Sequence, residues 1–226
     1  MAKRILVVFI FLILVMPAYG SKEKQVDRLN EAAVIMTEIM KIPEESIPQD
    51  LLDKAECVAI IPSMKKGAIG VGANYGRGCI LCRLSKGWSP PVMISVSGGS
   101  FGLQLGGTST DVVLLVMNKR GVDKLLESKF TLGADASAAA GPKGRTAAAA
   151  TDAQMTAEIL SYARSRGLFA GVSLTGSVLK PEADDNEDLY GRTVNVRKLL
   201  FEGGKTPAAA KKLINVLTKY SPRGKE

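Results

Sequence analysis

The chain has 226 residues, no histidine and a formal net charge of +8. Without histidine it lacks the commonest general base, the Ser-His-Asp triad and nearly all zinc hydrolase motifs, which excludes most classes of enzyme. The basic excess favours an anionic partner, and an aromatic content of only 5% argues against nucleic acid, whose bases stack on aromatic rings.

The N-terminus has the pattern of a signal peptide. The positive pair Lys3-Arg4 precedes an apolar run over residues 5–16, and small residues favour cleavage between Gly20 and Ser21. The run is shorter than the roughly 20 residues that span a bilayer, which favours a cleaved signal over a retained anchor.

We therefore expect residues 1–20 to direct export and residues 21–226 to form one domain. Export places the mature protein in the periplasm or cell envelope, or outside the cell. Lipid or envelope polymer is the expected partner there.

Two helices and a strand are predicted next. Apolar residues at helical spacing predict an amphipathic helix over residues 25–41. A proline suited to a first turn, Pro48, predicts a short helix over residues 49–55. The apolar run 57–61, ended by Pro62, predicts a short buried strand.

Glycine-punctuated strands dominate residues 67–117. The segments between them are short, so strands adjacent in sequence are expected to pair as antiparallel hairpins. Glycines inside strands, such as Gly70 and Gly72, indicate bulges or close backbone approach. The expected strands are 68–75, 79–84, 92–97, 102–105 and 111–117, with turns at 76–78, 86–91, 98–100 and 106–108.

The remainder predicts a short helix, an ordered loop, a late hairpin and C-terminal helices. The short helix is expected over residues 120–127, the ordered loop over 134–150 and the late hairpin over 159–163 with 168–174. The C-terminal helices are expected over residues 183–190, 196–201 and 207–220. The expected fold class is α+β, with a strongly twisted or barrel-like, glycine-rich, mainly antiparallel sheet flanked by helices at both termini.

The cysteines indicate neither a disulfide framework nor a metal site. Cys57, Cys79 and Cys82 are few and odd in number. Cys79 and Cys82 lie three apart in a predicted strand, so they point to opposite faces. We expect buried thiols that behave as small hydrophobes.

No cofactor or metal is expected. Gly204-Lys205-Thr206 resembles the end of a phosphate loop, but Leu199 stands where that motif requires glycine. The acidic run 184–188 offers oxygen ligands for calcium, yet its spacing does not match an EF-hand. An acidic helix start, stabilised by the helix dipole, is favoured.

Basic residues recur in the predicted turns. Together they are the candidate anion-binding surface, because lysine and arginine in turns lie at the protein surface. They are Lys65, Lys66, Arg77, Lys143, Arg145 and Arg192.

Several glycine-rich and apolar motifs follow one another in order along residues 26–220. They include Val58-Ala59-Ile60-Ile61-Pro62, Gly98-Gly99-Ser100-Phe101-Gly102, Asp111-Val112-Val113-Leu114-Leu115, Gly133-Ala134-Asp135-Ala136-Ser137 and Gly141-Pro142-x-Gly144-Arg145. This ordered series resembles the SYLF domain family.

The resemblance implies binding of phosphoinositides or other anionic lipids. It also points to the N-terminal helix, which contacts membranes in some members and here carries Lys22, Lys24, Arg28 and Lys41 among acidic residues. Eukaryotic members link membranes to actin during endocytosis. Actin is not an expected partner here, because an exported protein would not meet it.

We therefore expect non-enzymatic binding of anionic phospholipid or phosphoinositide-like headgroups at a membrane surface in the cell envelope. The alternative is a structural or stress-related envelope protein that binds a protein partner or assembles with itself.

Overall fold

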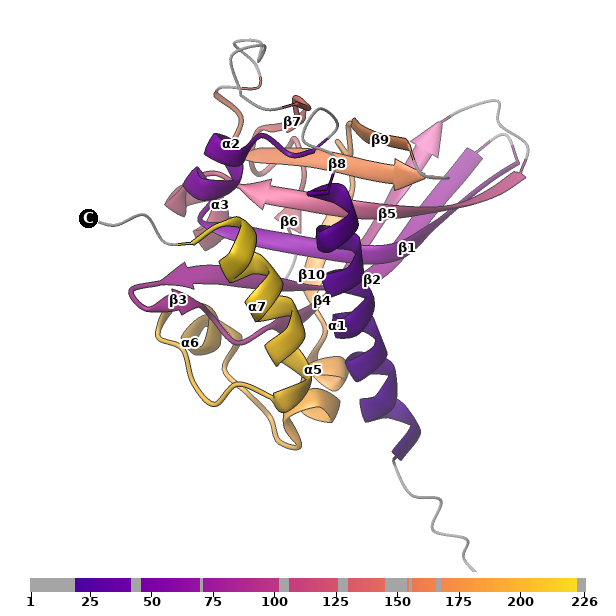
Figure 1. The fold of residues 1–226 in the computed structure, drawn as a ribbon. Helices are drawn as coiled ribbons and strands as arrows, with labels where there is room; N and C mark the ends of the chain where they lie inside the picture. The colour runs from indigo at the N-terminus through magenta and orange to yellow at the C-terminus, as the bar shows by residue number, and fades with distance from the viewer. Residues whose placement is uncertain are drawn as a thin grey trace, which may run out of the picture.

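The computed structural model describes residues 19–41, 46–69, 71–101, 106–125, 130–144, 154, 156–165 and 168–222. It has the α+β architecture expected from the sequence. A strongly curled, mostly antiparallel sheet forms a half-barrel, with helices from both ends of the chain packed against it (Figure 1).

The first helix, α1 (Tyr19–Ile39), is longer at its N-terminal end than predicted and includes the expected cleavage position. Its predicted apolar side is confirmed, because Leu29, Ala32 and Met36 are fully buried. Helix α2 (Gln49–Lys54) matches its prediction to within one residue. Both helices therefore form where apolar spacing and proline placement indicated.

Four long strands build the sheet, where the sequence pattern indicated shorter ones. They are β1 (Cys57–Ile69), β2 (Val71–Leu84), β4 (Val92–Phe101) and β5 (Gly106–Val116), with the two-residue β3 (Gly87–Trp88) beside β2. The turns predicted at 76–78, 98–100 and 106–108 are wrong, because these residues continue the strands. The expected strand 102–105 lies outside the described residues.

The glycines of the supposed turn 76–78 instead allow close packing. A Cβ on Gly78 would lie 2.1 Å from the carbonyl oxygen of Ile60, and one on Gly76 would lie 2.5 Å from Cγ2 of Ile61. Since real Cβ atoms do not approach so closely, β2 accepts only glycine where it crosses the middle of β1.

Pro62 does not end β1, contrary to the prediction. The strand continues to Ile69 through a bulge, where Ser63 has a φ of 49° and the pairing with β5 shifts between Ile61 and Met64. The backbone N–H of Ser63 donates to Oδ1 of Asp111 over 2.9 Å. The bulge accommodates Pro62, because a residue in a bulge does not have to donate a hydrogen bond to the neighbouring strand, and proline has no N–H to donate.

The strand order is β6-β10-β4-β2-β1-β5-β8-β7. Pairing of consecutive strands is confirmed for β1 with β2, but β5 pairs with β1 and β8 rather than with β4. Strand β10 (Val178–Pro181), which was not predicted, occupies the other edge of β4. The late hairpin is confirmed as β8 (Ile159–Ser165) and β9 (Leu168–Gly171).

The two outermost strands of this order are joined by a short turn. Strands β6 (Phe130–Thr131) and β7 (Ala138–Ala140) are linked through a bridge between Leu132 and Ala136. The β7–β8 pair is parallel. The sheet therefore curls around an interior, as in a barrel that is not fully closed.

Alternation along the strands divides the core into two layers. Cys79 and Leu81 point to the outer face, which packs against α1, whereas Ile80 and Cys82 point to the inner face. The opposite orientation of Cys79 and Cys82 is as predicted.

The C-terminal helices cover different parts of the sheet. Helix α5 (Ala183–Tyr190) and helix α7 (Lys211–Tyr220), the latter preceded by the 3-10 turn η2 (Ala208–Ala210), contact α1 on the outer face. Leu199 and Leu200 of α6 (Val196–Phe201) enter the inner layer, as does Val122 of α3 (Lys119–Leu125). The predicted bounds of α5 and α6 are confirmed.

Candidate functional site

The ends of β1, β2, β4 and β5 lie side by side at one edge of the molecule. The backbone pairs Ile69 with Val71, Val71 with Phe101, and Ala68 with Gly106. Figure 1 shows these ends projecting beyond α1, away from α6 and α3. We call this edge, from residue 64 of β1 to residue 75 of β2 and the neighbouring parts of β4 and β5, the distal end.

Two of the predicted basic residues, Lys65 and Lys66, lie at the distal end and are exposed. Lys65 is opposite Tyr75, whereas Lys66 is opposite Asn74. Because directly opposed residues share a face, Lys65 belongs to the outer face and Lys66 to the inner face. Within the described part of the chain neither amine has a carboxylate within 4.0 Å.

Tyr75 presents a large ring beside Lys65. It is 46% exposed, and its hydroxyl accepts a hydrogen bond of 2.7 Å from Nε of Arg77. This hydrogen bond, with the charge of Asp185 and against partial burial, raises the pKa of Arg77 above its usual value. The outer side of the distal end thus combines a cation with an amphipathic ring.

A buried carboxylate holds Arg77, predicted to belong to the anion-binding surface, and Arg28, predicted to belong to the membrane-contact helix. The Asp185 side chain is 6% exposed and receives Nη1 of Arg77 at 2.9 Å and Nη1 of Arg28 at 3.2 Å. Nε2 of Gln25 donates to the same carboxylate at 2.9 Å. These contacts tie α1, β2 and α5 together, so the two arginines hold the fold while Arg77 also reaches the surface.

The acidic run at the start of α5 is therefore partly internal. Asp185 is a buried ion-pair centre, which neither interpretation of this run anticipated. Across the described residues, no group of three potential metal-ligating side chains gathers in one place. Nor do these residues include a helix long and apolar enough to cross a bilayer.

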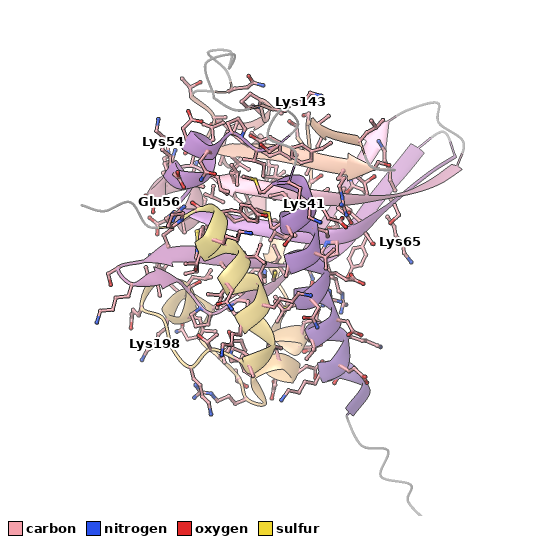
Figure 2. All side chains as sticks on the ribbon, in the orientation of Figure 1. Lys41, Lys54, Glu56, Lys65, Lys143 and Lys198 are labelled. Atoms are coloured by element: carbon pink, nitrogen blue, oxygen red, sulfur yellow. A yellow bond between two sulfur atoms is a disulfide. The ribbon has the colours of Figure 1, made fainter. Side chains whose placement is uncertain are left out.

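Two further predicted basic residues, Lys143 and Arg192, do not lie at the distal end. Lys143 is exposed but lies far from Lys65, as the labels in Figure 2 show. Arg192 is exposed just after Gly191, which caps α5 with a φ of 68°. Arg145 lies outside the described residues. The structure brings together Lys65, Lys66 and Arg77 and separates Lys143 from them.

Helix α1 offers no cationic surface. Its apolar side is buried in the core, and apart from Val34 the side that reaches solvent is polar. The exposed charged residues on that side and in the following turn are Lys22, Glu23, Lys24, Asp27, Glu31, Glu38 and Lys41, with acids outnumbering lysines.

A disulfide joins Cys57 and Cys82, which corrects the expectation of three free thiols. The bulge in β1 makes this possible. At the distal end Lys65 is opposite Tyr75 and Ile69 is opposite Val71, but beyond the bulge the register shifts by one residue, so that Cys57 faces Cys82. Without the shift, Cys57 would face Arg83. Only Cys79 remains free, and it is buried as expected.

A cavity lies next to this disulfide, at the end of the sheet opposite the lysines. Its volume is about 540 Å³, and it is lined by the disulfide, Val122 and residues of α6. Its charged lining residues balance, with three cations, Arg83, Arg197 and Lys198, and three acids, Glu56, Asp123 and Glu202. The cavity therefore favours neither an anionic nor a cationic ligand.

Comparison with known proteins gives consistent matches. The model of the Ysc84 family, described as "Las17-binding protein actin regulator", matches residues 97–220. An SH3 domain-containing protein of Schizosaccharomyces pombe is 38% identical over 178 residues, which cover 77% of this chain and 41% of that protein. SH3 domain-containing YSC84-like protein 1 of Bos taurus is 33% identical over 200 residues, covering 85% and 58%.

A third relative, LAS seventeen-binding protein 3 of Saccharomyces cerevisiae, is 35% identical over 178 residues, which cover 77% of this chain and 39% of that protein. This chain thus spans about 39% to 58% of the length of these three relatives.

Proposed function

The chain belongs to the Ysc84, or SYLF, family, and from this premise we propose that it is a binding module, not an enzyme, that attaches to anionic phospholipid headgroups through its distal end. The observation that carries the proposal is the pair Lys65 and Lys66, both exposed and without a carboxylate neighbour in the described part of the chain.

The surroundings of the lysines suit a membrane surface. The exposed ring of Tyr75 lies beside Lys65, and tyrosine is enriched at the level of lipid headgroups because its ring is apolar and its hydroxyl is polar. Each lysine near an anionic membrane contributes about 1 kcal/mol. Attachment by two lysines and a tyrosine is therefore expected to be weak, reversible and sensitive to salt.

Co-sedimentation with vesicles tests this proposal. Binding should rise with the fraction of phosphatidylglycerol and fall with salt. The double variant Lys65→Glu/Lys66→Glu should bind at least about thirtyfold more weakly, since it removes about 2 kcal/mol of attraction and adds repulsion. Binding that ignores lipid charge would overturn the proposal.

A matched control separates this site from net charge. Lys54 and Lys198 are also exposed, and Figure 2 places them on the side of the molecule away from Lys65. The variant Lys54→Glu/Lys198→Glu changes the net charge by the same amount. It should retain most of the binding, and an equal loss would show that overall charge, not the distal end, attracts the membrane.

We further propose that the protein is exported and works at the cell envelope. The signal-like pattern of residues 1–20 supports this, as does the Cys57–Cys82 disulfide, because disulfides persist mainly in oxidising compartments. The mass of the protein recovered from a periplasmic or secreted fraction tests both the removal of residues 1–20 and the formation of the disulfide. A reduced protein that retains residues 1–20 in the cytosol would contradict the proposal.

A protein partner is the second candidate function. The family description, "Las17-binding protein actin regulator", favours it, as does the name of one relative, LAS seventeen-binding protein 3. Light scattering and pull-down in the absence of vesicles would distinguish this function. Stable complexes that survive the Lys65→Glu/Lys66→Glu change would favour a protein-binding surface elsewhere.

A further inference from the structure

A cavity of about 420 Å³ lies on the inner face of the half-barrel near the distal end. Strands β1, β2, β4, β5 and β8 and the segment 172–177 all contribute to its lining. The other end of the inner layer is occupied by side chains of α3 and α6. The mouth of a barrel-like sheet is a frequent location for small-ligand sites, and this volume falls in their usual range.

An unsatisfied buried amide lines this cavity. Asn74 is 8% exposed, and its side-chain oxygen Oδ1 is buried without a hydrogen-bond partner in the described part of the chain. Buried polar atoms are nearly always paired, because an unpaired one loses its bonds to water without replacement. A ligand that donates a hydrogen bond would satisfy Asn74.

The lining also selects the charge of the ligand. Lys66 lies at the solvent boundary, and the described lining contains no acidic residue. Hydroxyl-bearing residues surround the cavity, namely Thr110, Ser173, Thr175 and Ser177. By contrast, the cavity beside α6 is charge-balanced, and the groove between α1 and β5 includes both Glu31 and Asp111.

Two small residues near the cavity lie on the inner face. A Cβ on Gly98, which is opposite Asn74, would lie 2.8 Å from Oγ of Ser177 and 2.9 Å from Oδ1 of Asn74, so this glycine allows close packing. Ala163 of β8 lines the cavity and is opposite Val112, whose side chain belongs to the inner layer. A larger side chain at position 163 therefore extends into the cavity, whereas one at Gly99, opposite Ala73, would point to the outer face.

We propose that this inner cavity binds a phosphorylated polyol, with the phosphate at Lys66 and a polyol hydroxyl donating to Oδ1 of Asn74. The single cation, the unsatisfied acceptor and the hydroxyl-lined wall together match a ligand with one anionic group and several hydroxyls. Glycerol phosphate has this chemistry, either free or as the headgroup of phosphatidylglycerol. The lipid-bound form of the proposal rests on the proposed function.

Three variants and one matched control test the cavity. Ala163→Leu fills it, Asn74→Asp places a negative charge in it, and Lys66→Ala removes its cation. Lys65→Ala is the control, because it removes the same charge from the adjacent residue on the opposite face. Urea unfolding of each variant checks that the fold is retained, and Asn74→Leu supplies a further variant if Asn74→Asp unfolds.

The first measurement is binding of free glycerol 3-phosphate, followed by ligand-observed NMR, with glycerol as the uncharged comparison. We expect the wild-type protein and Lys65→Ala to bind it. Lys66→Ala should bind about tenfold more weakly, and Ala163→Leu should not bind. Equal binding by folded Ala163→Leu and wild-type protein would overturn the proposal.

The second measurement is sedimentation with phosphatidylglycerol vesicles. If free glycerol 3-phosphate does not bind but Ala163→Leu weakens vesicle binding, the ligand is the headgroup of the intact lipid, which supports the proposal. If vesicles bind wild-type protein and Ala163→Leu equally and the free probe does not bind, the cavity proposal fails while the proposed function stands. If the free probe binds and vesicles do not, the cavity is a soluble-ligand site and the proposed function fails.

Discussion

Nη1 of Arg77 on β2 donates a hydrogen bond to Oδ1 of Asp185 on α5 over 2.9 Å, across 108 positions in the sequence. The same carboxylate accepts from Arg28 and Gln25 of α1. One buried side chain thus connects the N-terminal helix, a central strand and a C-terminal helix. The three elements are held in place by charge as well as by the apolar core.

Removing Asp185 should cost much more stability than removing Arg77. Asp185→Ala leaves Arg28 partly buried without its partner, so we expect the free energy of unfolding to fall by about 3 kcal/mol. The Arg77 side chain is 42% exposed, and Arg77→Ala should cost less than about 1 kcal/mol. Urea denaturation measures both, and equal losses would contradict the buried arrangement.

The addition of a methyl group should destabilise the protein at Gly78 and have little effect at Gly99. Gly78→Ala forces a Cβ against the carbonyl oxygen of Ile60, so the free energy of unfolding should fall by about 3 kcal/mol. Gly99→Ala adds a Cβ in open space and should change it by less than about 0.5 kcal/mol. Thermal unfolding of the two variants side by side makes the comparison. A stable Gly78→Ala would mean that β1 and β2 are not so close.

Loss of the disulfide should destabilise the protein without exposing new charge. Cys57 and Cys82 are 25 positions apart, and a closed loop of this length stabilises the folded state by about 3 kcal/mol. The double variant Cys57→Ala/Cys82→Ala should lose about that much in urea denaturation. Cys79→Ala serves as the control, because it leaves the disulfide intact. Non-reducing peptide mapping that finds no Cys57–Cys82 link would refute the pairing.

Cys79 should be unreactive in the folded protein. Complete burial raises the pKa of its thiol from 9.0 to about 12, although Arg28 opposes the shift. Iodoacetamide should therefore label Cys79 at neutral pH only after denaturation, because the thiolate is the reactive form.

The same shift has a consequence for alkaline stability. A thiol whose pKa is higher in the folded state favours folding fully below pH 9.0, and this contribution disappears as the pH rises from 9.0 towards about 12. Urea denaturation over this range should show a smaller alkaline loss for Cys79→Ala than for the wild-type protein. An identical loss in the two would argue against a buried Cys79.

Local patterns correctly predicted most of the helices and the antiparallel character of the sheet. The spacing of Leu29, Ala32 and Met36 located the buried side of α1, since helical period depends on adjacent residues alone. The glycines at 76 and 78 misled, because glycine marks both a turn and a close approach of strands. Only the presence of Ile60 and Ile61 against β2 distinguishes the two.

The candidate sites show the same division. Lys65 and Lys66 were recognisable from the sequence as surface cations, but their positions on opposite faces follow from the register of β1 against β2. No sequence pattern identified Asn74, because its significance lies in an oxygen that the fold leaves without a partner. The Asp185 cluster also escaped notice, since its members come from three distant segments.

The sequence by itself determined the charge, the lack of histidine chemistry, the amphipathic helices and the glycine-rich strands, all properties of residues or short segments. The tertiary structure decided which strands pair, and the bulge at Pro62 and Ser63 decided their register. A shift of one residue there places Cys57 opposite Cys82. Such registers depend on contacts between distant segments, and no local sequence pattern predicts the free energies of those contacts.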